Sequence, residues 1–236
     1  DIINDSLGFP FRYGYDYKVN YNLNNIGTWD TLENGDRLWR LKIICSGAYS
    51  INLVYNNFYL PENSMFFIYN EEQNYVLGPY TERINRNYDE YATGLIPGST
   101  TILEYFEPFQ KRGLGTIELS NIIYAYKNIV EFYLNNNSPI GLKSPQLLSS
   151  GSCNRDVKCS EGADWCREIF SVSRVLVGNG HLCSGSLINN AREDFTPYYL
   201  TANHCNSGNP NTWVFEFGYR RSGCGSGGLY QTVQYT

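Results

Sequence analysis

Short apolar runs separated by turn residues characterise the first half of the chain. In residues 38–43, apolar and polar positions partly alternate. A period of two directs one side of an extended segment toward a core and the other toward solvent, which is the pattern of a β-strand. Further strands are predicted over residues 50–60, 65–69, 75–80, 100–106 and 117–126. No stretch shows the period of a long amphipathic helix.

Turn signals separate these segments. Asn34-Gly35 predicts a type I′ hairpin turn, because both residues tolerate a positive φ angle. Pro97-Gly98 and Gly113-Leu114-Gly115 mark further breaks. Short strands at this spacing predict an all-β fold, with a jelly-roll-like β-sandwich in the first part of the chain. Residues 1–20 have no clear period and are interpreted as a linker or a first edge strand.

The composition changes between residues 128 and 150. Asn135-Asn136-Asn137-Ser138-Pro139 and Ser144-Pro145-Gln146 are polar and rich in turn formers. Six of the seven cysteines follow residue 150. These features predict a β-sandwich domain over 1–128, a linker over 129–150 and a cysteine-rich second domain over 151–236.

Charge and cysteine usage narrow the class of protein. The net charge of -5 argues against a nucleic-acid partner, which requires a basic surface. No apolar run reaches the length of about 18 residues that spans a membrane. Clustered cysteines predict an oxidising compartment, so the protein is expected to be secreted, extracellular or periplasmic. The chain starts at Asp1 without a signal peptide, which indicates a processed product or a fragment.

The most informative chemistry lies around a histidine next to a cysteine. Thr201-Ala202-Asn203-His204-Cys205 follows the apolar run Tyr198-Tyr199-Leu200. An earlier cysteine opens the segment Cys183-Ser184-Gly185-Ser186-Leu187-Ile188. A general base in nucleophilic catalysis is most often a histidine held within hydrogen-bond reach of its partners. Without a family likeness, however, a structural role is the preferred interpretation of His204.

These two segments, with Gly151-Ser152-Cys153-Asn154 and Cys159 followed by Glu161-Gly162, resemble a lysyl-endopeptidase-type serine protease. This is a secreted bacterial branch of the trypsin-like proteases. The resemblance implies part of a trypsin-like β-barrel after the sandwich, in residues 151–236. Residues before 128 resemble, more loosely, the pro-region of such precursors, and three stretches carry that likeness. They are Gly35-Asp36-Arg37-Leu38-Trp39-Arg40-Leu41, Ser50-Ile51-Asn52-Leu53 and Ile102-Leu103-Glu104-Tyr105-Phe106-Glu107-Pro108.

The resemblance implies roles for individual residues. His204 matches the catalytic general base. Cys183 and Cys205 match the disulfide beside it, and Cys159 and Cys224 match a second one. Cys153 matches a cysteine whose partner lies beyond Thr236. Cys45 and Cys166 match nothing in the family, and they either pair with each other or stay reduced and buried.

Two members of a catalytic triad have no counterpart in this sequence. After Cys205 there is no Asp, and Glu216 is the only acid. Gly225-Ser226-Gly227 follows His204 too closely for a nucleophile and is interpreted as a turn beside a disulfide. The chain is thus predicted to be the amino-terminal fragment of a secreted serine endopeptidase precursor, a hydrolase zymogen acting on peptides or proteins. By itself it is expected to be inactive, and the family's lysine specificity does not follow from it.

A metal site is a competing interpretation of the same residues. His181, Cys183, His204 and Cys205 form a donor set that zinc accepts, but they lack the usual Cys-x-x-Cys spacing. No metal or other cofactor is therefore predicted, and His181 is interpreted as an exposed loop residue.

The alternative function is that of a non-catalytic extracellular module that binds glycans or proteins. Trp29, Trp39 and Tyr55 would contribute, since aromatic side chains suit such surfaces. For Trp39, core packing is the preferred interpretation.

Overall fold

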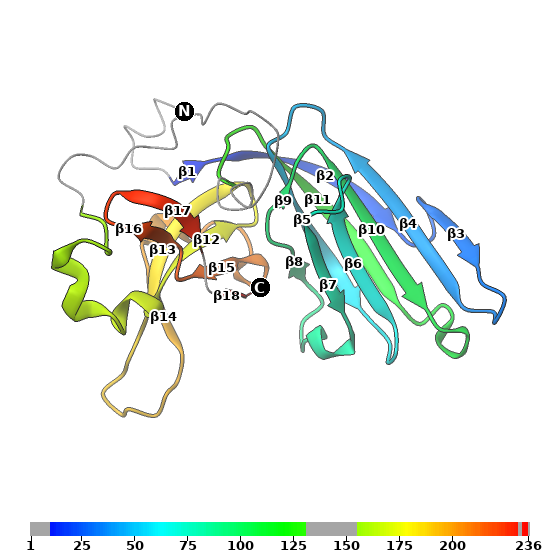
Figure 1. Ribbon diagram of the computed structural model, residues 1–236. Coiled ribbons are helices and arrows are strands. Elements are labelled where there is room, and N and C mark those ends of the chain that lie inside the picture. Colours follow the sequence, from blue (N-terminus) through cyan, green and yellow to red (C-terminus); the bar gives the residue numbers. More distant parts are fainter. Residues whose placement is uncertain (1–9, 131–154, 231–232, 236) are drawn as a thin grey trace. The chain divides into compact units, whose positions relative to one another are not determined.

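The computed structural model describes residues 10–130, 155–230 and 233–235, and antiparallel strands dominate them (Figure 1). No sheet among these residues closes into a barrel. The all-β class and the β-sandwich are thus confirmed. The chain forms two compact units: Gly14–Lys127, and the chain before Gly14 together with the chain from Asn128 onward.

The unit Gly14–Lys127 is a sandwich of two antiparallel sheets. The first sheet has the order β3 (Thr28–Thr31), β4 (Arg37–Ile44), β10 (Thr100–Glu107), β6 (Met65–Asn70), β7 (Val76–Tyr80). The second has the order β2 (Gly14–Asn22), β11 (Thr116–Ala125), β5 (Ser50–Tyr59), β8 (Tyr91–Ala92), and β9 (Ile96–Pro97) also pairs with β5. Two short 3-10 helices, η1 (Glu82–Ile84) and η2 (Phe109–Lys111), lie in the connections.

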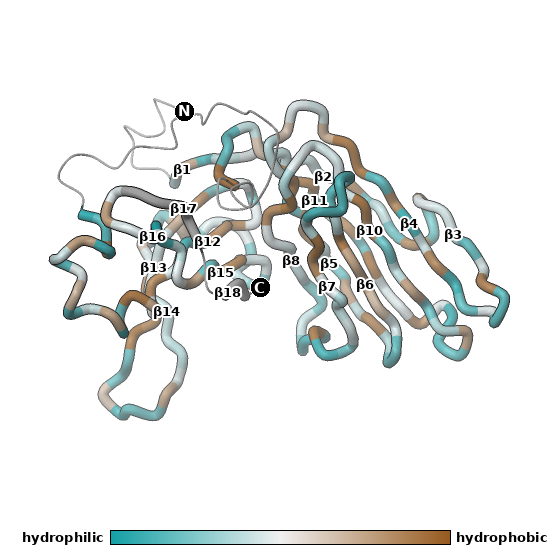
Figure 2. The backbone as a smooth tube through the Cα atoms, viewed as in Figure 1, coloured by the Kyte–Doolittle hydropathy of each residue, from teal (hydrophilic) through white to brown (hydrophobic). Residues whose placement is uncertain are grey.

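The sandwich core forms because both sheets direct alternate residues inward. Along β4, buried positions alternate with exposed ones from Trp39 onward, and Figure 2 shows the same alternation as bands of colour. The first sheet contributes Trp39, Leu41, Phe66, Ile68, Leu103 and Tyr105 to the core. The second contributes Leu53, Tyr55, Ile117, Leu119 and Ile122. Burial of these large side chains provides the main stabilisation of the unit.

The burial of two aromatic residues bears on the alternative of a binding module. Trp39 is 1% exposed and Tyr55 is 0% exposed, so neither can contact a ligand. Core packing of Trp39 is confirmed. Trp29 is half-buried, donates from Nε1 to the Leu23 carbonyl at 2.9 Å, and has the Arg37 guanidinium 4.1 Å above its ring. The binding-module interpretation is therefore not favoured.

The hairpin at Asn34-Gly35 is present, but its turn type differs from the prediction. Gly35 has φ +86°, whereas Asn34 is not among the residues with positive φ. The Gly35 N–H donates to the Leu32 carbonyl at 2.9 Å, which closes a type I turn. A glycine in the left-handed region then forms a bulge, the common geometry of a three-residue hairpin loop. The connection is one residue longer than a type I′ turn allows.

The second unit contains an open sheet with the order β1 (Phe11–Arg12), β13 (His181–Ile188), β12 (Val172–Val177), β15 (Val214–Phe217), β18 (Val233–Tyr235). Strand β14 (Tyr198–Thr201) also pairs with β13, and β16 (Arg220–Gly223) pairs with β17 (Ser226–Tyr230). The described residues of this unit also form four 3-10 helices: η3 (Ser160–Trp165), η4 (Glu168–Ser171), η5 (Asn203–Cys205) and η6 (Pro210–Thr212). Its small core contains Val175, Val177, Cys183, Cys205 and Trp213.

Some predictions fall on residues that the structure does not describe. The linker over 129–150 lies outside the described residues except for Ile129 and Val130, which are buried. Gly151-Ser152-Cys153-Asn154 also lies outside them. The domain limits 1–128 and 151–236 stay predictions.

The sandwich core offers a direct test. Leu103 is fully buried in β10, so Leu103→Ala is expected to lower the free energy of unfolding by about 2–5 kcal/mol, because it leaves a cavity. Leu114→Ala, at a leucine that is 58% exposed, is the matched control, with an expected change within about 0.5 kcal/mol. Urea unfolding measures both values, and equal losses would contradict the assigned core.

Candidate functional site

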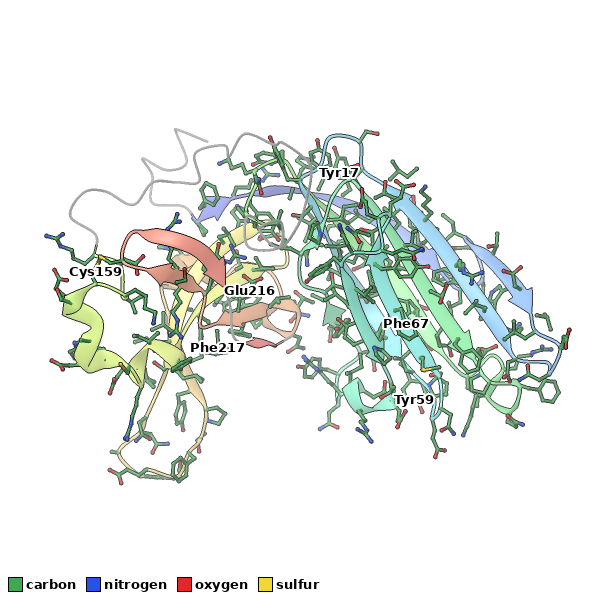
Figure 3. The ribbon with its side chains drawn as sticks, in the orientation of Figure 1. Tyr17, Tyr59, Phe67, Cys159, Glu216 and Phe217 are labelled. Atoms are coloured by element: carbon green, nitrogen blue, oxygen red, sulfur yellow. A yellow bond between two sulfur atoms is a disulfide. The ribbon has the colours of Figure 1, made fainter. Side chains whose placement is uncertain are left out.

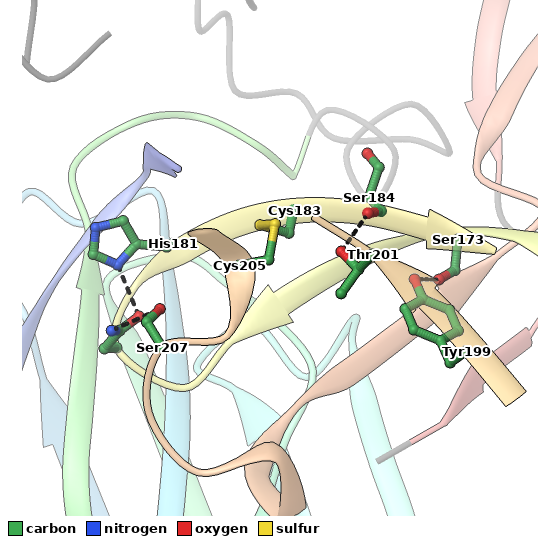
Figure 4. Close-up of a disulfide and its surroundings, with 9 residues drawn as sticks. Ser173, His181, Cys183, Ser184, Tyr199, Thr201, Cys205 and Ser207 are labelled. Atoms are coloured by element: carbon green, nitrogen blue, oxygen red, sulfur yellow. Dashed lines mark hydrogen bonds between the residues drawn. A yellow bond between two sulfur atoms is a disulfide. The ribbon is translucent and has the colours of Figure 1, made fainter. Parts of the chain in front are cut away.

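The predicted disulfide between Cys183 and Cys205 is present and anchors the loop that carries His204 (Figure 4). Cys183 lies in β13, and Cys205 ends the short helix η5, with a Cα–Cα distance of 6.0 Å. Both cysteines are buried in the small core of the second unit. The Cys205 N–H donates to the Ala202 carbonyl at 3.0 Å, which closes the turn around His204. The bridge therefore fixes the backbone after the histidine, and the hydrogen bond to Ala202 holds the backbone before it.

His204 itself is exposed on this fixed turn. One of its ring nitrogens and the two disulfide sulfur atoms all lie within 4.8 Å of one another. Within the part of the chain that the structure describes, no hydrogen bond to the His204 ring is found. Proton transfer by histidine requires a partner at about 2.6–3.2 Å, directly or through one water. The exposed ring is thus accessible to a partner that the described residues do not supply.

Two side-chain contacts brace β14, the strand that leads to His204. Thr201 donates from Oγ1 to the Ser184 carbonyl at 2.8 Å, and the hydroxyls of Ser173 and Tyr199 are 2.6 Å apart. The Tyr199 ring packs edge-to-face on Phe215, with ring centroids 4.9 Å apart. Burial raises the pKa of Tyr199 above its ordinary value, so the phenol stays neutral as a hydrogen-bonding group.

His181 occupies a different environment from the one predicted. It is not an exposed loop residue but the half-buried first residue of β13. Its Nδ1 lies 2.7 Å from Asn179 Oδ1, and Asn179 Nδ2 donates to Ser207 Oγ at 3.4 Å. Burial, and secondarily the positive charge of Arg12, lowers the pKa of His181. The neutral ring therefore belongs to a small polar network beside the His204 loop (Figure 4).

The donor set considered for zinc does not fit a metal. Cys183, His204 and Cys205 do cluster, but the two sulfur atoms are joined in a disulfide. Cysteine binds zinc as a thiolate, which a disulfide does not offer. His181 is not part of this cluster. The structure thus favours a structural bridge over a zinc site.

Glu216, the only acid after Cys205, is used elsewhere (Figure 3). It is fully buried and forms an ion pair with Arg174 across β12 and β15. The Arg174 guanidinium in turn lies 3.9 Å from the centroid of the Tyr219 ring. Phe215 belongs to the same core as the disulfide, so its neighbour Glu216 points to the opposite face of the sheet. Glu216 therefore cannot orient His204.

Residues 147–236 match the family model described as the lysyl endopeptidase C-terminal domain. The second part of the chain is thus similar to lysyl endopeptidases, and the match covers less than half of the 236 residues. The match covers the site built above, including both disulfides. No solved structure matches the chain. Among the described residues, no helix is both long and apolar enough to cross a membrane.

The other cysteines of the chain agree in part with the expectations. Cys159 and Cys224 form the second predicted disulfide, with a Cα–Cα distance of 4.5 Å. Cys45 and Cys166 are free, which favours reduced thiols over the alternative that they pair with each other. The expected burial is wrong for Cys166, which is exposed, and Cys45 is half-buried. Cys153 lies outside the described residues.

The segment Gly225-Ser226-Gly227 forms part of a hairpin, as predicted. Gly223 pairs with Ser226 across β16 and β17, which places Cys224 and Gly225 in the turn. Cys224 carries the disulfide to Cys159. The interpretation as a turn beside a disulfide therefore holds for Gly225, whereas Ser226 and Gly227 belong to β17.

Removal of the bridge beside His204 tests its structural role. The double variant Cys183→Ser/Cys205→Ser is expected to lose about 3 kcal/mol of stability, because a link across a separation of 22 residues constrains the unfolded chain. Cys166→Ser, at the exposed free thiol, serves as the control and should change little. Chemical denaturation followed by tryptophan fluorescence provides the free energies, and an unchanged double variant would contradict the assignment.

The environment of His181 predicts a pH dependence of stability. Because its pKa is lowered on folding, the unfolded chain binds the proton more readily. Stability should therefore fall as the pH drops below about 6.5 and continue to fall down to the lowered folded value. His181→Gln should flatten this fall, and Arg12→Gln should reduce it only in part, because burial remains the larger cause. Unfolding free energies between pH 7.5 and 5 would contradict the assignment if His181→Gln kept the full slope.

Proposed function

We propose that residues 151–236 carry the catalytic histidine of a secreted, trypsin-like serine endopeptidase, and that residues 1–128 form its pro-region. The observation that carries this proposal is the His204 turn. A buried disulfide fixes the turn in a segment related to lysyl endopeptidase, and the histidine ring is left exposed. Rigid presentation of an accessible imidazole is what a general base requires.

In the proposed mechanism, His204 takes a proton from a serine hydroxyl while the serine oxygen attacks the scissile carbonyl. The same ring then donates that proton to the departing amine. A carboxylate must hold the imidazole in the correct tautomer during both steps. We propose that the serine and the aspartate come from residues beyond Thr236, since Glu216 is buried in an ion pair and residues 206–236 contain no aspartate.

Two features support the proposed setting. Structural disulfides form and persist in oxidising compartments, and two of them stabilise the second unit. A β-sandwich with its own core precedes the protease-like segment, as a separately folded pro-region would. We accordingly propose a secreted zymogen whose substrates are peptides or proteins.

Loss of the imidazole tests the role of His204 in the longer, complete enzyme. His204→Gln is expected to reduce kcat on a peptide amide substrate by a factor on the order of a million, because triad members act as a unit. His181→Gln, at the chain's other histidine, should retain activity within a few-fold. A matching far-UV circular dichroism spectrum confirms that both variants fold. Retention of kcat by His204→Gln would refute the assigned role.

The 236-residue chain offers a complementary measurement. Without a nucleophile it should neither hydrolyse peptide substrates nor react with a fluorophosphonate serine probe. Serine-reagent-sensitive turnover by this chain would contradict the proposed division of the triad.

A further inference from the structure

An N-terminal strand pairs with the sheet that carries the candidate site. Phe11 and Arg12 of β1 pair antiparallel with Leu182 and His181 of β13. The Tyr13 N–H extends this pairing by donating to the Gly180 carbonyl at 2.8 Å, and Tyr13 is fully buried. The chain then leaves this sheet, because Gly14 begins β2 in the sandwich. Residues 11–13 are therefore the part of the predicted pro-region that belongs to the second unit.

Strands β1 and β14 pair with the same edge of β13, at different residues. Strand β12 pairs with β13 from His181 to Ser186 and thus occupies one edge of that segment. A strand has only two edges, so β14, which pairs with residues 185–188, and β1, which pairs with residues 181–182, share the other one. Cys183 and Ser184 lie between the two contacts. The position of β1 is thus next to the bridge that fixes the His204 turn.

A chain of side-chain contacts also connects β1 to this turn. Arg12 lies opposite His181 in the register, and His181 contacts Asn179. Asn179 contacts Ser207, which follows the second cysteine of the bridge by two residues. Figure 4 shows His181 and Ser207 on the same side of the disulfide. A strand at this edge of β13 therefore lies beside the network of His181, Asn179 and Ser207.

We propose that the edge of β13 at residues 180–182 is a binding edge for an extended polypeptide, and that β1 fills it in cis. Exposed strand edges pair readily with an added strand, and main-chain hydrogen bonds supply the affinity in such complexes. The β1 contact is short, but its covalent link to the sandwich gives it a high effective concentration. The polypeptide that β1 excludes is a peptide substrate of the protease-like unit, a point that rests on the proposed function. The exchange of β1 for an added strand does not depend on the proposed function.

The antiparallel ladder identifies the groups to change. Because Tyr13 donates to Gly180, alternation directs the Phe11 N–H toward Leu182 and the Arg12 N–H away from β13. Phe11→Pro removes a ladder donor, whereas Phe11→Ala removes the side chain and keeps the donor. The double variant Phe11→Pro/Tyr13→Pro removes both donors that face β13.

Hydrogen exchange of the 236-residue chain is the first measurement. Phe11→Pro should accelerate amide exchange at Leu182 at least tenfold, Phe11→Ala much less, and the double variant at least as much as Phe11→Pro. Exchange in β4 of the sandwich and the masses of the two disulfide-linked peptides verify that each variant is folded. Unchanged exchange at Leu182 in both proline variants would overturn the proposal.

The second measurement adds the strand in trans. A fluorescent peptide spanning residues 9–15 should bind the double proline variant and restore slow exchange at Leu182, and it should bind wild type at least tenfold more weakly. Equal affinity for both proteins, or binding without protection of Leu182, would overturn the proposal. Neither readout needs catalysis, so failure here is distinguishable from failure of the role assigned to His204.

Discussion

The disulfide between Cys183 and Cys205 is the interaction on which the candidate site depends. It joins a central strand of the open sheet to the turn that carries His204, and it lies in a small core with Val175, Val177 and Trp213. A helix of a single turn contains few hydrogen bonds and opens easily unless tertiary contacts stabilise it. Here a covalent bond and burial hold the turn together. The histidine ring can therefore be exposed without being disordered, and this combination makes its catalytic assignment physically reasonable.

The sandwich has a different basis for its stability. Its two sheets contribute alternate large residues to one core, and its free thiol at Cys45 takes no part in a bridge. The unit thus relies on apolar burial, while the second unit, with fewer buried residues, relies on two disulfides. Small cores commonly need such covalent support. This contrast supports the proposed pro-region, while the described sheet of the second unit is open.

Local patterns predicted strands well where one side of the strand faces a core. The alternation in β4 and the apolar run of β5 led to the correct segments, because burial on one side imposes the period of two. For residues 1–20 the sequence left a linker or a first edge strand open, because exposed aromatic residues such as Tyr15 and Tyr17 gave no clear period, and β2 is an edge strand. Strand β1 has two residues and is defined only by its partner, β13. No local signal could have shown a pairing between segments so distant in sequence.

The candidate site likewise combines features that the sequence predicted with features that it did not. Cysteine spacing and a family resemblance identified both bridges, because the residues that make them are conspicuous in the sequence. The prediction of an exposed loop for His181 was wrong. The glycines around Asn179 indicated a loop, whereas pairing with β1 and β12 makes His181 a strand residue. The hydroxyl contact of Ser173 with Tyr199 was missed for a related reason. It depends on which strands are neighbours, and local sequence does not encode that.

Energetics also decide whether Glu216 could serve as the missing acid. To reach the face that carries His204, it would have to leave a fully buried ion pair with Arg174. Separating such a pair costs about 3–5 kcal/mol, because an uncompensated charge stays buried. A new hydrogen bond to a charged imidazole returns about 1.5–3 kcal/mol. The exchange is unfavourable even before β15 is rearranged. The carboxylate that orients His204 in the proposed enzyme must therefore come from another residue, and the Arg174–Glu216 pair serves to fix β12 against β15.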